Sequence, residues 1–393
     1  MTRVPPRPLR TLSILGLVTV LVAVAVLLPS LVMPPASPSA GPTVSVRDET
    51  PALDGVFDPG IILAAASNGS ATLLGGIGVY TKLPRDFSLP VLAELLPSVG
   101  GAHAVNLTAA VNQYFYAGGI YAIGWNGTAW LIAGQATWNG TNYGTAVAMT
   151  GSGFRNLTPA FEPFFVGGGI FAVGWNGTSW LLGGNSTSGV ALVALRGTSA
   201  TGLSSRLPST APDRWLQLLQ WNGAEWLVGG EGVFGTLDGT DFTNLLGATP
   251  FAGTGAWAGA GDGTGWIAGG GGGRLVVVGG SGVTVVPPLT STFDQAALMI
   301  IGVPGGYLVG GKGLSAQGRF MGELVFWNGR TAASVVTDWT AQIPSSFAGG
   351  EIQGGASAAP FGSGAILLVG EGSYENVTGA GVGAIALASL AGA

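Results

Sequence analysis

Residues 167–184 read GGGIFAVGWNGTSWLLGG. Two short apolar runs flank the pair Asn176-Gly177, and an Asn-Gly pair between such runs is the strongest short-range signal for a tight turn between antiparallel strands. A Gly-Gly pair closes the second run at Gly183 and Gly184. The stretch therefore predicts a β-hairpin that ends at a glycine pair.

Variants of this hairpin recur along the chain. The closest copy is AGGIYAIGWNGTAWLIAG at residues 117–134. The turns of seven copies are marked by Asn68, Asn126, Asn176, Asn222, Asp262, Pro304 and Gly362. Successive turns are 40 to 58 residues apart, which suits the four-stranded blades of a β-propeller.

A phenylalanine precedes the turn residue by 11 positions in five of the copies. These residues are Phe57, Phe115, Phe165, Phe251 and Phe293. An aromatic side chain at one fixed position of a repeat predicts a buried contact between neighbouring blades.

Two further apolar runs follow the hairpins, such as VALVAL at 190–195 and GFRNLTPAF at 153–161. Four short strands per unit with glycine-rich turns predict an all-β fold, a seven-bladed β-propeller of four-stranded blades that spans residues 44–393. In the first unit, residues 89–96 fit either a third strand or a short helix.

The segment VRDETPAL at 46–53 matches FRNLTPAF at 154–161 nearly position for position, and VNLTAAV at 105–111 is a further match. The later copies end a blade, whereas the first precedes all of them, and the last unit has only three strands of its own. We therefore expect the N-terminal strand to complete the last blade and remove its open edge; the alternative is a loose strand on the first blade.

The N-terminus has the pattern of a membrane anchor. Residues 1–11 carry three arginines and no acid, and residues 12–33 are long and apolar enough to span a bilayer as a helix. Residues 34–43 form a Pro/Ser/Ala linker. We expect a single-pass signal anchor with a cytoplasmic stub and an extracytoplasmic propeller; a cleaved signal peptide, which would leave a secreted protein, is the alternative.

Charge and composition narrow the partners. Without Arg3, Arg7 and Arg10 the chain keeps 11 basic residues against 19 acidic ones, a net charge of about −8. This balance argues against nucleic-acid binding. The chain has no cysteine and one histidine, His103, so it offers neither a disulfide nor a Cys/His metal site, and we predict no metal, cofactor or catalytic triad.

Eight of the 13 asparagines stand in Asn-x-Ser/Thr triplets: Asn68, Asn106, Asn126, Asn139, Asn156, Asn176, Asn185 and Asn376. In an exported chain these are candidate N-glycosylation sites. Asn-Gly-Thr is also a favourable hairpin turn, and that interpretation serves Asn68, Asn126 and Asn176 equally well.

The segments that follow the Gly-Gly pairs are expected to gather on one face of a propeller. The residues that follow the second strand of each hairpin include a mixed polar set that we predict as a ligand-binding loop face: Gln135, Asn185, Glu231, Lys312 and Glu371. Ordinary solvated loop tips are the alternative. The tryptophans of the hairpins suit either inter-blade packing or sugar stacking.

The order of apolar strand, turn, WLLGG, loop and second apolar strand resembles the kelch repeat of galactose-oxidase-type propellers, through pairs such as Gly183-Gly184 and Gly229-Gly230. The resemblance implies a binding or scaffold module for protein or glycan partners at the cell surface. The alternative is an extracytoplasmic enzyme that acts on glycosides with carboxylates at the propeller face, for which the candidates are Asp58, Glu162, Asp213, Asp294 and Glu351.

Overall fold

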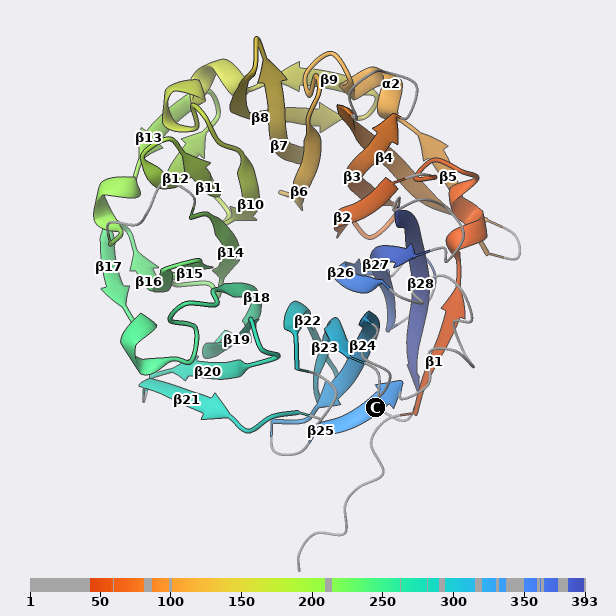
Figure 1. Cartoon of the computed structure of the whole chain (residues 1–393), viewed down its shortest axis with the longest axis vertical. Helices are drawn as coiled ribbons and strands as arrows, with labels where there is room; N and C mark the ends of the chain where they lie inside the picture. The colour runs from red at the N-terminus through yellow and green to blue at the C-terminus, as the bar shows by residue number, and fades with distance from the viewer. Residues whose placement is uncertain are drawn as a thin grey trace, which may run out of the picture. The chain divides into compact units, whose positions relative to one another are not determined.

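The computed structural model describes residues 43–391 except 59, 81–86, 99–100, 209–213, 262, 281, 290–293, 315–319, 330–331, 337–349, 359–360, 362–363 and 374–380. These residues form seven four-stranded antiparallel sheets arranged as a ring (Figure 1). The predicted seven-bladed β-propeller is confirmed. The predicted membrane segment at 12–33 lies outside the described residues, and no helix within them is long and apolar enough to cross a bilayer.

Each blade contributes strands in chain order from the centre outward. Blade 1 contains β2 (Gly60–Ser67), β3 (Thr72–Tyr80), β4 (Phe87–Ser98) and β5 (Gly101–Asn106). Blade 2 contains β6 (Gly119–Trp125), β7 (Trp130–Trp138), β8 (Thr141–Thr150) and β9 (Gly153–Asn156). Blade 3 contains β10 (Ile170–Trp175), β11 (Trp180–Ser186), β12 (Gly189–Arg196) and β13 (Ser199–Gly202). Blade 4 contains β14 (Leu216–Trp221), β15 (Trp226–Gly230), β16 (Val233–Asp238) and β17 (Asp241–Asn244).

The remaining blades follow the same order. Blade 5 contains β18 (Ala256–Gly261), β19 (Gly265–Gly270), β20 (Leu275–Gly279) and β21 (Gly282–Val286). Blade 6 contains β22 (Ala296–Val303), β23 (Gly306–Leu314), β24 (Phe320–Trp327) and β25 (Ala332–Val336). Blade 7 contains β26 (Glu351–Ser357), β27 (Ala365–Ser373), β28 (Gly381–Ala391) and, as its outermost strand, β1 (Thr43–Asp48). Residues 89–96, which fitted either a strand or a helix, lie in strand β4.

The Gly-Gly pairs are explained by two close approaches. A Cβ on the second glycine, Gly184, would lie 1.9 Å from the carbonyl oxygen of Gly169 beside the innermost strand of the same blade. A Cβ on the first glycine of such a pair would press on the next blade: on Gly75 it would lie 2.4 Å from Cγ2 of Ile120. The first glycine therefore lets blades pack closely, and the second lets the hairpin close beneath a bulge.

Ring closure occurs in the last blade, as predicted. Strand β1 pairs with β28 along its whole length, from Thr43 opposite Ala391 to Asp48 opposite Ala386 (Figure 1). The second half of the predicted strand differs, because Thr50–Leu53 form a 3₁₀ turn rather than a strand. The same change occurs in blade 2, where β9 ends at Asn156 and Thr158–Ala160 form a 3₁₀ turn.

This strand-end motif has a common hydrogen-bond pattern. Oδ1 of Asp48 accepts the backbone N–H of Thr50, and Oδ1 of Asn156 accepts that of Thr158. Each of these hydrogen bonds turns the chain out of the strand. The Thr158 hydroxyl then bonds both backbone groups of Ala146 in β8, at 3.2 and 3.4 Å. Thr50 bonds Ile385 of β28 in the same way, at 3.1 and 3.3 Å. The N-terminal segment thus occupies the place that each fourth strand occupies in its own blade.

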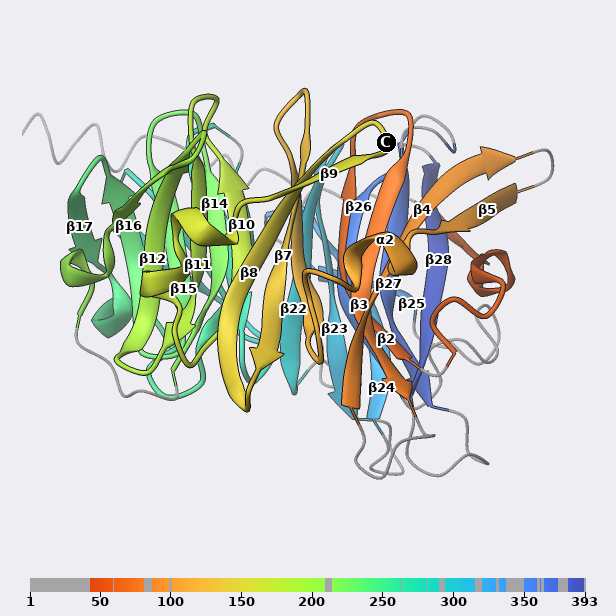
Figure 2. The same ribbon diagram turned by 90° about the horizontal axis from the view of Figure 1, so that it is seen from above.

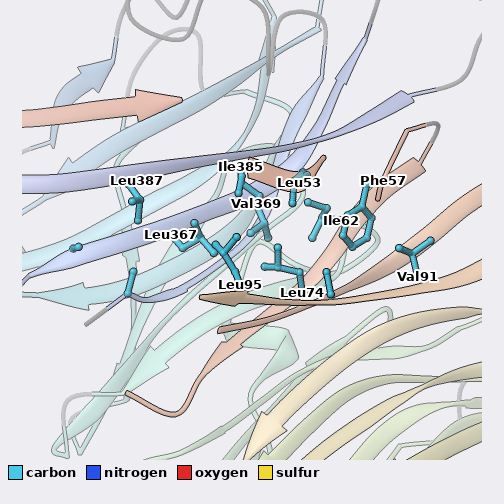
Figure 3. Packing of buried hydrophobic residues seen from close by; sticks show 13 residues of the cluster. Leu53, Phe57, Ile62, Leu74, Val91, Leu95, Leu367, Val369, Ile385 and Leu387 are labelled. Carbon is cyan, nitrogen blue, oxygen red and sulfur yellow. The ribbon is translucent and has the colours of Figure 1, made fainter. Parts of the chain in front are cut away.

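The core lies between neighbouring blades. Figure 3 shows the cluster that joins blade 7 to blade 1, in which Phe57 packs with Leu74 of β3 and Val369 of β27. Phe57, Phe115, Phe165 and Phe251 are each at most 1% exposed, so the predicted packing position is confirmed for these four, and Phe293 lies outside the described residues. The side view shows the hairpins standing next to one another around the ring (Figure 2).

The hairpin tryptophans also pack between blades. Trp130, Trp180, Trp226 and Trp266 are buried, and a Cβ on Gly124 of blade 2 would meet the Trp180 ring of blade 3 at 2.7 Å. Packing rather than sugar stacking therefore explains these four side chains.

A candidate ligand site at the channel mouth

Every innermost strand carries a β-bulge at the same place. The register shifts by one residue between the buried positions on either side of the bulge, for example between Ile120 and Ala122 in β6. A bulge re-aims the extra side chain, and here the extra residue lines the central channel. The seven residues of this bulge ring are Leu63, Tyr121, Phe171, Gln217, Trp257, Leu298 and Gln353.

The bulge ring borders a central cavity of about 290 Å³. The innermost strands of all seven blades supply its lining. Three bulge residues are aromatic, two are aliphatic and two are glutamines. Apolar side chains and polar groups therefore both face the cavity, as they do in many ligand sites.

The aromatic residues of blades 2 to 5 form an arc, which comprises Tyr121, Phe171, Trp215 and Trp257. The ring centroids of Tyr121 and Phe171 are 5.0 Å apart, and those of Phe171 and Trp215 are 6.2 Å apart. All four side chains are half-buried. Burial raises the pKa of the Tyr121 phenol, so this side chain remains a neutral hydrogen-bond donor well above neutral pH.

A glycine stands two residues before each aromatic bulge residue. A Cβ on Gly119 would lie 3.3 Å from Cζ of Tyr121, and a Cβ on Gly169 would lie 3.1 Å from Cζ of Phe171. A Cβ on Gly255 would lie 2.7 Å from Nε1 of Trp257. The rings therefore lie back along the channel wall over these glycines, toward the end of the propeller where the innermost strands begin. We call this end the Gly-Gly face.

The five predicted binding residues lie at the Gly-Gly face, but not in loops as expected. Gln135, Asn185, Lys312 and Glu371 are within strands, because the second strands of these blades remain paired beyond the glycine pair. Glu231 is in the turn between β15 and β16. All five are half-buried, so they are not free loop tips.

Three of the residues that follow a Gly-Gly pair reach the next blade at its aromatic position. A Cβ on Gly119 would lie 2.7 Å from Cγ1 of Ile77, and a Cβ on Gly169 would lie 3.1 Å from Oε1 of Gln135. A Cβ on Gly255 would lie 3.3 Å from Cγ of Glu231. Gln135 and Glu231 thus place polar groups beside the rings of Phe171 and Trp257.

The structure pairs Glu231 with a cation. Arg214 Nη1 donates to Glu231 Oε2 at 2.6 Å. The neighbouring Trp257 Nε1 is buried and forms no hydrogen bond within the described residues. A buried donor without a partner costs free energy, so a ligand oxygen that accepted this N–H would gain a hydrogen bond.

Lys312 and Glu371 belong to a second polar group across blades 6 and 7. Lys312 Nζ lies 2.9 Å from Glu351 Oε2, and the Gln353 amide donates to the same carboxylate. Glu371 is the cross-strand partner of Glu351. Burial raises the pKa of the Glu371 carboxyl, the Glu351 carboxylate raises it further, and Lys312 opposes both.

The side-chain carbonyl of Asn185 forms a hydrogen bond with the backbone and is not available to a ligand. Its Oδ1 accepts the N–H of Gly169 at 2.9 Å, which joins two strands of blade 3 at the Gly-Gly face. Of the five predicted residues, Gln135 and Glu231 are therefore beside the aromatic arc, Lys312 and Glu371 form the charged group, and Asn185 is structural.

The other predicted catalytic candidates do not come together. Asp58, Glu162 and Asp294 are exposed, Asp213 lies outside the described residues, and only Glu351 has a second carboxylate beside it. His103 is exposed on the outermost strand β5. In the described part of the chain, no group of three or more His, Cys, Asp or Glu side chains could hold a metal ion.

Comparison with known proteins shows the fold alone. No family model matches the chain, and no curated protein matches its sequence. The WD40 β-propeller domain of Doa1 is similar in structure, with a TM-score of 0.50 and 10% identity over 84% of this chain and 92% of that one. A structure described as YCF48 bound to D1 peptide has a TM-score of 0.52 and 12% identity over 84% of this chain and 93% of that one. These similarities support a β-propeller, a fold commonly used for binding or scaffolding, and nothing in them is specific to kelch repeats.

Sequence analysis missed the aromatic arc. A signal was present, because the three-residue pattern Gly-apolar-aromatic recurs at the start of the innermost strands as Gly119-Ile-Tyr121, Gly169-Ile-Phe171 and Gly255-Ala-Trp257. In a regular strand, where successive side chains alternate between the two faces of the sheet, these side chains would point into the space between blades. The bulge instead directs them into the channel.

Proposed function

We propose that the protein is a carbohydrate-binding β-propeller that holds a neutral oligosaccharide at the channel mouth on the Gly-Gly face. The observation that carries this proposal is the aromatic arc of Tyr121, Phe171, Trp215 and Trp257 beside polar side chains. A sugar ring has an apolar face of C–H groups and an edge of hydroxyls. Aromatic faces accept the first, and the amide of Gln135 and the carboxylate of Glu231 accept hydrogen bonds from the second.

The charges of the site favour a neutral ligand. The carboxylate of Glu231 is bonded to Arg214, that of Glu351 is bonded to Lys312, and burial favours the uncharged form of Glu371. An ionic ligand would have to displace one of these pairs, whereas hydroxyl groups can bond to them as they are.

The binding test is isothermal titration of recombinant propeller with chitotetraose, cellotetraose and mannotetraose. We expect saturable binding of at least one of these, and we expect Trp257→Ala to weaken it by about fivefold, since one stacking contact contributes on the order of 1 kcal/mol. Trp221→Ala is the matched control, because Trp221 lies at the opposite end of its innermost strand, next to the Asn222 turn. Equal affinity of Trp257→Ala and wild type would contradict the site, and no binding to any of the three would contradict the ligand class.

We further propose that residues 12–33 anchor the chain in a membrane, with the propeller on the extracytoplasmic side. The support is the sequence pattern of arginines, apolar span and proline-rich linker. Fractionation of the native host and the intact mass of the protein test this. A membrane-bound chain that retains residues 1–33 is expected, and a soluble chain trimmed near residue 39 would instead indicate a cleaved signal.

Glycoside hydrolysis is a second candidate, favoured by the Glu351–Glu371 pair. Lys312 forms an ion pair with Glu351, while burial raises the pKa of the neighbouring Glu371. Two carboxyl groups in different environments are what glycosidases use as base and acid. Release of nitrophenol from nitrophenyl glycosides by wild type, and loss of that release in Glu371→Gln but not in Glu162→Gln, would establish this activity in place of simple binding.

A further inference from the structure

We propose that Asn139 is the principal N-glycosylation site among the residues that the structure describes, which do not include Asn376, and that the stacked side chains of Tyr116 and Trp138 support its first sugar. The proposal rests on the proposed extracytoplasmic location of the propeller. It concerns a surface separate from the channel mouth.

The other described Asn-x-Ser/Thr triplets have structural roles in the fold. Oδ1 of Asn126 accepts the N–H of Thr128 and of Ala129 and the hydroxyl of Thr128, at 2.8 to 3.0 Å, and the triplets at Asn68 and Asn176 repeat this arrangement. In the triplets at Asn106 and Asn156, the asparagine bends the strand end and the threonine hydroxyl bonds the neighbouring strand. These residues are explained without a glycan.

Asn222 shows that the hairpin turn needs no triplet. It is followed by Gly223 and Ala224, so it is not an acceptor for a glycan, yet its Oδ1 accepts the N–H of Ala224 and of Glu225 at 2.9 Å. The hairpin turn is therefore sufficient to explain an asparagine at this position, without a modification.

Asn139 differs from these. Asn139 and Gly140 have φ values of 51° and 77°, which define a two-residue turn at the tip of the β7–β8 hairpin. Asn139 is exposed, and within the described residues neither its side chain nor the Thr141 hydroxyl forms a hydrogen bond. The turn accounts for the asparagine and glycine but leaves the threonine of the triplet without a structural role.

An exposed aromatic pair lies beside this turn. Trp138 is 46% exposed and Tyr116 is 57% exposed, and their rings stack with centroids 5.1 Å apart and planes at 22°. The N–H of Thr137 donates to the Tyr116 carbonyl at 2.8 Å, which fixes the loop to the hairpin. Large solvent-facing aromatic surfaces usually serve a contact. The C–H face of a sugar attached to the adjacent Asn139 can cover the exposed aromatic surface of Tyr116 and Trp138.

The chemistry is a group transfer from a lipid-linked oligosaccharide. The Asn139 Nδ2 attacks the anomeric carbon, the C–O bond to the lipid phosphate breaks, and the Nδ2 proton goes to a base of the transferase. The products are an N-linked glycan and the lipid phosphate. An exposed hairpin tip, with both its amide and the Thr141 hydroxyl unengaged, can present these groups to the enzyme.

The test uses the full chain purified from its native host. Fragmentation mass spectrometry of its glycopeptides is expected to show hexose or N-acetylhexosamine mass on Asn139 in most molecules, with lower occupancy at Asn126 and Asn176. Absence of sugar on Asn139 would overturn the proposal, whether the other sites are occupied or the whole chain is unmodified.

The aromatic support is tested separately with Trp138→Ala. In the glycosylated chain this substitution is expected to lower Tm by roughly 2 °C more than it does in an Asn139→Gln background. Equal shifts in the two backgrounds would overturn the support. Titration of unglycosylated Asn139→Gln protein with oligosaccharides measures binding at the channel mouth alone. Failure of the proposed oligosaccharide binding can therefore be distinguished from failure of the proposed glycosylation of Asn139.

Discussion

Single side chains at the channel mouth show how small sequence differences set the chemistry of each blade. Where the residue two places before the bulge is glycine, as at Gly169, the bulge residue is an aromatic ring that lies over it. In blades 4 and 7 that place holds Trp215 and Glu351, and the bulge residue is a glutamine. A glycine two places before the bulge therefore leaves room for an aromatic bulge residue to lie along the channel wall.

The pH dependence of stability provides a prediction for Glu371. Burial and Glu351 raise its pKa in the folded state, so the folded protein holds this proton more tightly than the unfolded chain does. As pH rises above the unfolded value of about 4.3, wild type loses stability relative to a variant with a neutral side chain there. We expect Glu371→Gln to have the Tm of wild type near pH 4 and a higher Tm at pH 7 to 8.

Thermal unfolding of both proteins across this pH range is the measurement. Glu162→Gln is the control, because Glu162 is exposed on a 3₁₀ turn. A Tm for Glu371→Gln that is lower than wild type by the same amount at every pH would show that the carboxyl acts as a hydrogen-bond partner and not as a buried acid.

At the scale of elements, the strand-end motif joins the third and fourth strands of several blades. In three blades an asparagine or aspartate ends the strand, and the threonine two residues later bonds the backbone of the neighbouring strand: Thr50 to Ile385, Thr108 to Leu92 and Thr158 to Ala146. In blade 3 the strand ends at Gly202, and Ser204 bonds Leu192 in the same way. At this point the fourth strand has ended and no longer pairs with the third strand. The hydroxyl therefore accepts a backbone N–H of the third strand that would otherwise have no partner.

We expect Thr158→Val to cost roughly 2 kcal/mol of unfolding free energy, because the Ala146 backbone would lose its partner in a half-buried place. The matched substitution Thr128→Val removes an exposed hydroxyl from a turn whose backbone bonds to Asn126 remain, so it should cost less than about 0.5 kcal/mol. Urea unfolding of unglycosylated protein measures both values. Similar costs for the two variants would mean that the motif adds nothing beyond a turn.

At the scale of the whole molecule, stability depends on closing the ring. Without β1, strand β28 would become an open edge. The 3₁₀ turn that follows β1 contributes Leu53 to the cluster between blades 7 and 1 (Figure 3). The described residues contain no disulfide that could replace this closure. One short N-terminal strand therefore holds together parts of the chain that are more than 330 residues apart.

Two truncations test this closure. Removal of residues 1–41 leaves β1 intact, and we expect the Tm of the propeller to be unchanged. Removal of residues 1–48 deletes β1, and we expect a lower Tm and aggregation through the exposed edge of β28, with recovery when a peptide of residues 43–53 is added. Equal Tm values for the two truncated proteins would show that the ring does not need its closing strand.

Much of the architecture was determined by the sequence alone, because it depends on local and repeated signals. Asn-Gly turns, glycine pairs and the phenylalanines 11 residues before each turn are short-range patterns, and repetition makes each of them visible several times. The match between residues 46–53 and 154–161 identified even the closing strand, since both segments form the same hydrogen bonds in their blades.

The candidate sites were decided by tertiary structure. The bulge ring exists because each hairpin closes over a glycine of its second strand, such as Gly134 or Gly184, and one residue is added to each innermost strand. This reverses the side of the sheet that Tyr121, Phe171 and Trp257 face. Whether Gln135 was a loop tip or a strand residue beside Phe171, and whether Asn139 was bonded or free, depended on contacts between blades and hairpins. A sequence repeat specifies the structure of each blade, but only the closed ring brings residues of different blades together at one channel.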